Sequence, residues 1–119
     1  MAKILISGKY GTNNPTLATL PFIAAKTAKQ KGHEVVIWLW DEATVLARRG
    51  AADPIVGVNL KPLREVLQEV IDLAIPVWAC KGCALARGVS PEELLPNAEI
   101  KEMADFIEAL VAFDKSVQF

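Results

Sequence analysis

The stretch Glu34-Val35-Val36-Ile37-Trp38-Leu39-Trp40 decides the fold class of this 119-residue chain. Its residues are mostly β-branched or aromatic, the types that strands favour. Both sides of the strand are apolar, which is typical of a central strand in a parallel sheet covered by helices on both faces. Core packing explains both sides, and a subunit interface is an alternative role for the two tryptophans.

Four other segments are consistent with the same sheet. Lys3-Ile4-Leu5-Ile6-Ser7 is a short apolar run closed by Gly8 and predicts another buried strand. Pro76-Val77-Trp78-Ala79-Cys80 predicts a third strand, with proline tolerated at its first position. Ala98-Glu99-Ile100 is a weaker strand, and residues 114–119 are expected to form an edge strand.

Helices are expected between these strands. Asn14 can cap a helix that has Pro15 at its first position and runs to Lys31-Gly32. Pro21 predicts either a kink in this helix or a later start near Thr19.

Four further helical segments follow from capping and periodicity. Asp41 is expected to cap a short helix that ends at Arg48-Arg49-Gly50. The motif Ser90-Pro91-Glu92-Glu93 resembles a capping box. Two segments have apolar residues at helical spacing: Leu63, Val66, Leu67, Val70, Ile71 and Ala74, then Met103, Phe106, Ile107, Leu110 and Val111.

Strands that alternate with helices predict an α/β fold. We expect one domain over residues 1–119: a three-layer α/β/α sandwich whose mostly parallel sheet has about five strands.

Composition limits the classes of function. The chain is 52% hydrophobic and 23% charged, enough for a real core, and its net charge of −1 argues against binding nucleic acid through phosphates. Its longest apolar run is too short to span a membrane, and its start does not resemble a signal peptide, so we expect a cytoplasmic protein with no membrane partner. A mean hydropathy of +0.28 is high for so short a soluble chain and favours a homo-oligomer over a monomer.

Cys80 is the best candidate for a reactive group. It ends a predicted buried strand, and ligands and catalytic groups of open α/β sheets gather at the carboxyl ends of strands. We expect backbone N–H groups, with Lys81 and Arg87 nearby, to lower the pKa of this thiol, while Gly82 allows a tight turn.

Cys83 is the second candidate catalytic residue. Cys80-Lys81-Gly82-Cys83 has the spacing of a redox dithiol and also of half a zinc site. The only histidine, His33, is expected at the opposite end of the sheet, so we predict no metal and no other cofactor. Cys83 fits a buried packing residue equally well.

A glycine-containing loop follows the first strand and is the remaining candidate segment. It does not match the phosphate-binding pattern of nucleotide-binding loops, so the rim of an active site fits it better. Asp41 and Glu42 are adjacent carboxylates that we interpret as helix-capping residues. The residues of this rim are Gly8, Lys9, Tyr10, Gly11 and Thr12.

The segment from Val77 to Ser90 resembles the DsrE/DsrF-like family, and within it the YchN-like branch. The resemblance rests on a CKxCxxxRG stretch, a downstream strand like Glu99-Ile100, an end like Asp114-Lys115-Ser116-Val117-Gln118-Phe119, and Lys31-Gly32-His33-Glu34-Val35 before the second strand.

The resemblance implies an α/β sandwich that assembles as a trimer or hexamer, and sulfur-relay chemistry. Its best-understood members carry a persulfide on a cysteine in a C-x6-RG pattern, onto which Cys80 and Arg87-Gly88 fall. Cys83 has no counterpart in the TusD-like members, which leaves open whether it resolves a persulfide as a disulfide.

Three hypotheses follow for function. In the first, a sulfurtransferase-like carrier accepts a sulfane sulfur on Cys80 from a donor protein and passes it to an acceptor thiol, with Lys81 and Arg87 stabilising the anion. In the second, Cys80 and Cys83 cycle between dithiol and disulfide. In the third, the chain is a non-catalytic oligomeric interaction module.

Overall fold

The computed structural model describes residues 1–119, and all five strands pair in one parallel sheet with the order β4-β3-β2-β1-β5. The predicted fold class is therefore confirmed, with a sheet that is parallel throughout. The elements are β1 (Lys3–Gly8), α1 (Pro15–Gln30), β2 (Glu34–Leu39), the 3₁₀ segment η1 (Asp41–Ala47), α2 (Leu63–Asp72), β3 (Val77–Cys80), α3 (Lys81–Ala86), the 3₁₀ turn η2 (Pro91–Glu93), β4 (Ala98–Lys101), α4 (Met103–Ala112) and β5 (Lys115–Gln118).

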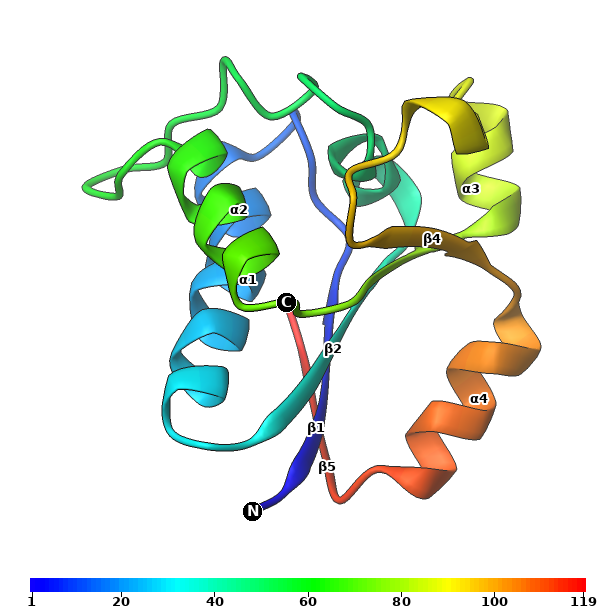
Figure 1. Ribbon diagram of the computed structural model, residues 1–119. Coiled ribbons are helices and arrows are strands. Elements are labelled where there is room, and N and C mark those ends of the chain that lie inside the picture. The colour runs from blue at the N-terminus through cyan, green and yellow to red at the C-terminus, as the bar shows by residue number, and fades with distance from the viewer.

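The two faces of the sheet are covered differently (Figure 1). Helices α1 and α2 lie together on one face and enclose a core cluster of 22 buried residues, which includes Phe22, Ile37 and Val66. The other face carries α4, and its buried cluster has only six residues: Leu5, Val36, Trp38, Cys80, Phe106 and Ala109. None of the helices is both long enough and apolar enough to span a membrane.

Helix α4 crosses its face of the sheet from one edge to the other, because it follows the edge strand β4 and leads into the opposite edge strand β5 (Figure 1). Phe106 turns inward between Trp38 and Trp40, with ring centroids 5.1 Å and 4.8 Å away. The thiol-bearing end of β3 therefore shares an aromatic cluster with α4.

Helix α1 begins at Pro15, as predicted, and the Asn14 side chain accepts a hydrogen bond from the N–H of Leu17. The alternative start near Thr19 is wrong, since the helix includes Pro21. The Pro21 ring is buried against Gly8, where an added Cβ would lie 2.9 Å from the Pro21 Cγ. An interior proline cannot donate the usual backbone hydrogen bond of a helix, and at this position its ring packs against Gly8 instead.

Two predicted caps are not formed. Asp41 adopts a left-handed backbone with φ 53° inside η1 instead of capping a helix. Ser90 donates its hydroxyl hydrogen bond to the Glu93 carboxylate, and the chain makes only a short 3₁₀ turn there. In both cases a side-chain partner replaced the backbone N–H that a cap would satisfy.

Candidate functional site

Cys80 is the last residue of β3 and immediately precedes α3, as the sequence predicts. Its side chain is on the α4 face, in the same cluster as Trp38, and only 8% of the residue is exposed. Residues 78 and 80 point to one face because side chains alternate along a strand. The thiol therefore lies at the carboxyl edge of the sheet but under an apolar cover.

Burial raises the pKa of the Cys80 thiol, because a thiolate loses solvation among apolar side chains. The backbone N–H of Cys83 opposes this effect, the Cys83 side chain adds to it, and the N–H of Gly82 makes a smaller opposing contribution. The Cys80 side chain does not make a capping hydrogen bond with the N–H groups at the start of α3. The predicted lowering of this pKa is therefore wrong: the N–H groups act as expected, but desolvation outweighs them.

Cys83 is the third residue of α3 and is only partly buried, and both cysteines are free thiols. Its side chain packs against the same cluster as Cys80. The structure thus brings the two predicted catalytic cysteines together, while their chemical roles stay a prediction. No group of three His, Cys, Asp or Glu side chains is arranged to hold a metal ion.

Arg87 is held by carboxylates and does not face the thiol of Cys80. Its Nε donates to Glu42 at 2.7 Å and its Nη2 to Asp41 at 2.6 Å. Its Nη1 donates to the backbone carbonyl of Cys83 at 3.1 Å. The guanidinium fastens α3 to η1 in this geometry, and its expected role as an anion stabiliser stays a prediction.

Asp41 and Glu42 are the residues whose role sequence reasoning missed. They follow the carboxyl end of β2, and Arg87 follows that of the neighbouring β3. Only the order of the strands brings these segments together, since the ion pairs span 45 and 46 positions of the chain. The one signal in the sequence was the shared location of all three residues after strand ends.

Lys81 also points away from the thiol. Its ammonium lies 3.4 Å from Glu102, and its side chain is 54% exposed. Lys101 was not predicted, yet it pairs in register with Cys80 and places its ammonium 5.1 Å from the centre of the Trp78 ring. The sheet register therefore brings a cation from β4 beside the end of β3.

Gly82 has open space where a side chain would be, so the expected need for a glycine in a tight turn is not met there. Gly88 is the residue with the special backbone, at φ 69° directly after the end of α3. The turn requirement thus lies at the far end of the helix.

The predicted rim, Gly8 to Thr12, packs against η1 rather than around the thiol. The Lys9 carbonyl accepts from the N–H of Ala43, and a Cβ on Gly11 would lie within 3.0 Å of the backbone of Glu42. Because β1 is two strands from β3, this loop starts roughly 10 Å from the end of β3. The loop therefore packs against the segment that carries Asp41 and Glu42, and it does not border Cys80.

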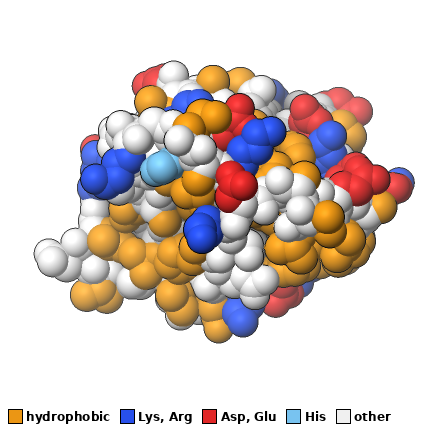
Figure 2. Space-filling view, turned by 90° about the horizontal axis from the view of Figure 1, so that it is seen from below, with side chains coloured by type: hydrophobic (Ala, Val, Ile, Leu, Met, Phe, Trp, Pro, Cys, Tyr) orange, Lys and Arg blue, Asp and Glu red, His pale blue; other side chains and the backbone are white.

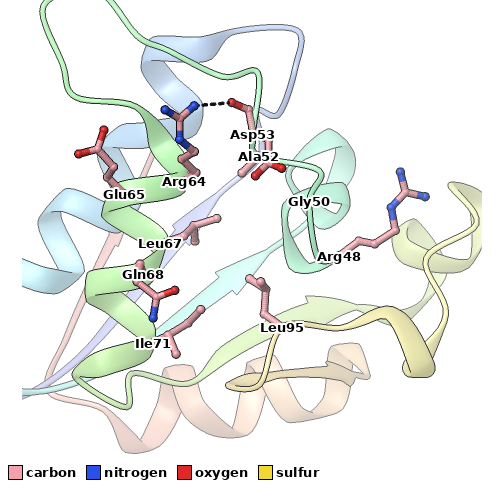
Figure 3. A pocket seen from close by; sticks show the side chains of 10 residues that line it. All are labelled: Arg48, Gly50, Ala52, Asp53, Arg64, Glu65, Leu67, Gln68, Ile71 and Leu95. Carbon is pink, nitrogen blue, oxygen red and sulfur yellow. Dashed lines mark hydrogen bonds between the residues drawn. The ribbon is translucent and has the colours of Figure 1, made fainter.

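The largest cavity, of about 400 Å³, lies elsewhere, between α2, the segment from Arg48 to Asp53, and Leu95 (Figure 3). Among the lining residues, one side-chain hydrogen bond joins the Arg64 guanidinium to the Asp53 carbonyl at 3.4 Å. Neither cysteine lines this cavity or either of the two smaller ones. The thiol site is therefore a covered surface site and not a pocket of the single chain.

Comparison with known proteins identifies relatives over most or all of the chain. The model of the DsrE/DsrF-like family matches residues 2–119. An uncharacterized protein of Methanopyrus kandleri is 30% identical over 80% of this chain and 75% of its own length. A second, from Methanocaldococcus jannaschii, is 32% identical over 80% of each chain. Among solved structures, the ychN protein of E. coli superposes over the whole of both chains with a TM-score of 0.85 at 22% identity.

Proposed function

This chain belongs to the DsrE/DsrF-like family, and from that premise we propose that it is a sulfur carrier that holds a sulfane sulfur as a persulfide on Cys80. The observation that carries the proposal is the place of Cys80, at the carboxyl end of a parallel strand and directly before the first turn of α3. Sulfur-relay chemistry in the family requires such a cysteine.

Loading and unloading are two thiol exchange steps. The Cys80 thiolate attacks the outer sulfur of a donor persulfide, which forms the new S–S bond and releases the donor thiolate. An acceptor thiolate then attacks the outer sulfur on Cys80, and the Cys80 thiolate leaves. No net oxidant is consumed, because the sulfane sulfur keeps its oxidation state through both steps.

The surroundings of Cys80 suit storage between these steps. Trp38 and Phe106 restrict water on the side of α4, so a loaded persulfide is shielded from solvent reactants. The N–H groups of Gly82 and Cys83 favour the anionic form at the moment of exchange. Burial keeps the empty thiol protonated and slow to react with unrelated electrophiles.

Mass spectrometry of the intact chain tests this proposal. After incubation with a low-molecular-weight persulfide, the Cys83→Ser variant should gain about 32 Da, one sulfur atom, and the Cys80→Ser/Cys83→Ser double variant should gain nothing. Equal gain by the double variant would assign the sulfur to another residue. Ser116→Ala is a matched surface control and should load like the parent.

We propose further that the chain is a trimer or hexamer, in contact with donor and acceptor proteins in the cytoplasm. The outer face of α4 supports an oligomer: Met103, Ile107, Leu110 and Val111 are 48%, 49%, 37% and 81% exposed. Apolar areas of this kind mark protein interfaces. Figure 2, which looks onto the amino ends of the strands, also shows hydrophobic side chains in broad areas between scattered charges.

A dithiol redox role is the second candidate, because the two free thiols belong to one cluster. Titration of the free thiols against a glutathione series separates it from the carrier role, since only a redox protein requires a reversible two-electron couple in the biological range.

A further inference from the structure

The two thiols of the site differ in exposure in an informative way. Cys80 is buried under the aromatic cluster, whereas Cys83, one helical turn later, is partly open to solvent. Both side chains contact the same cluster. A sulfur stored on Cys80 therefore has a second thiol beside it that small molecules reach more easily.

The position of Cys83 relative to Cys80 is fixed by its backbone. Its backbone carbonyl accepts a hydrogen bond of 3.1 Å from the Arg87 guanidinium. Arg87 is in turn held by Asp41 and Glu42 at 2.6 Å and 2.7 Å. The third residue of α3 is thus tied through its carbonyl to Arg87, and through Arg87 to η1.

The atom that Cys83 can reach is the sulfur of Cys80 itself. The Cys83 side chain is close enough to the Cys80 thiol to contribute to its raised pKa. Cys80 directly precedes α3, Cys83 lies in its first turn, and both side chains belong to one packed cluster. A disulfide between them requires their Cβ atoms to come within about 3.8 Å.

Building on the proposed carrier function, we propose that Cys83 is a resolving thiol that discharges the Cys80 persulfide as hydrosulfide. The Cys83 thiolate attacks the inner sulfur, so that a Cys80–Cys83 disulfide forms and the bond to the outer sulfur breaks. The electron pair of that bond leaves on the outer sulfur, which takes up the proton lost by Cys83 and departs as hydrosulfide. The sulfane sulfur is reduced and the two cysteines are oxidised, so the step balances without another reactant.

This reaction makes the fate of the stored sulfur a competition. An acceptor thiol that arrives first removes the outer sulfur and regenerates the free Cys80 thiol. Without an acceptor, the chain ends as a disulfide and cannot load again until a dithiol reductant, such as a small thiol–disulfide oxidoreductase, opens it. The site then carries a second activity, the reduction of a persulfide to hydrosulfide.

The test uses the reduced full-length chain, loaded without oxygen with purified glutathione persulfide and freed from it by rapid gel filtration. The wild-type chain should release about one equivalent of hydrosulfide, fall to about 2 Da below its reduced mass, and lose both alkylatable thiols. Cys83→Ser and Cys83→Ala should stay about 32 Da heavier and release at least tenfold less. Leu85→Ser, an exposed change on the same helix, should behave like wild type.

The outcomes separate this proposal from the carrier function. If wild type keeps its extra sulfur on Cys80, or if Cys83→Ser and Cys83→Ala release hydrosulfide as fast as wild type, the resolving role is overturned while the carrier function stands. If peptide mapping finds the extra sulfur on Cys83, attack occurred at the outer sulfur and the proposal is also overturned. If neither wild type nor the Cys83 variants gain sulfur, the carrier function itself fails.

Discussion

The two faces of the sheet divide the physical tasks of this chain. The face under α1 and α2 buries 22 residues and holds no candidate reactive group, whereas the face under α4 buries six and includes Cys80. The first face has two helices to exclude water, and the second has one helix whose outer side is itself apolar. The difference indicates that most of the buried core lies on the first face, while the proposed chemistry and the proposed assembly both fall on the second.

The largest expected effect tests this division through two phenylalanines. Phe22→Ala empties the α1 face, where the side chain is fully buried, and should lower the free energy of unfolding by about 3–5 kcal/mol. Phe106→Ala on α4 should cost less, about 2–3 kcal/mol, since the thinner layer can relax. Urea unfolding measures both. Equal losses would contradict the comparison.

Alkaline pH should lower the free energy of unfolding through the thiol of Cys80. The native pKa of Cys80 is raised by burial, so the folded chain holds this proton longer than the unfolded chain does. The contribution to stability is complete below the unfolded pKa of about 8.5 and is lost as pH rises through the native value.

The slope of unfolding free energy from this thiol should not exceed about 1.4 kcal/mol per pH unit. Cys80→Ser should remove it, and Cys83→Ser serves as the comparison. Denaturant titrations between neutral and alkaline pH measure the slope. An unchanged slope in Cys80→Ser would show that another group titrates.

Arg87→Lys tests how firmly α3 is fastened beside the thiol. A lysine ammonium cannot reproduce the forked contacts with Asp41 and Glu42, so we expect a small loss of unfolding free energy, kept modest because these carboxylates are partly solvated. The alkylation rate of Cys83 should rise at the same time. Arg64→Lys, whose guanidinium lies at the cavity of Figure 3, is the matched control and should leave that rate unchanged.

The smallest effect on the isolated chain is expected at the outer face of α4. Ile107→Lys should change the free energy of unfolding of the dissociated chain by less than about 0.5 kcal/mol, because the residue is 49% exposed. The same change should dissociate the oligomer, measured by light scattering. Glu108→Gln is the control on the same helix. If the parent chain is already a monomer, the proposal that the outer face of α4 is a subunit interface is wrong.

Most of the fold could be predicted because its signals are local. The apolar runs that became β1, β2 and β3, the spacing in α2, and Asn14 before α1 each lie within one element. The predictions failed where a distant partner decided the outcome. Arg87 forms an ion pair with Asp41 in η1, and the absence of a side chain on Gly8 leaves room for the ring of Pro21.

The candidate site shows the same limit. The place of Cys80 at a strand end follows from its own segment, but its electrostatics do not. Burial by α4 sets the direction of its pKa, and Lys101 reaches its neighbourhood through the pairing of β3 with β4. Neither the strand order nor the burial of Cys80 can be deduced from the spacing of the two cysteines.

The crossing of α4 from β4 to β5 also sets an order of events during synthesis. Until β5 has emerged, β1 is an edge strand, because β5 is its outer partner in the sheet. Trp38 lies uncovered over the same interval, since Phe106 comes late in the chain. A nascent chain therefore exposes a bare strand and an aromatic surface, the features that chaperones bind, and it closes over its thiol only after α4 and β5 have been synthesised.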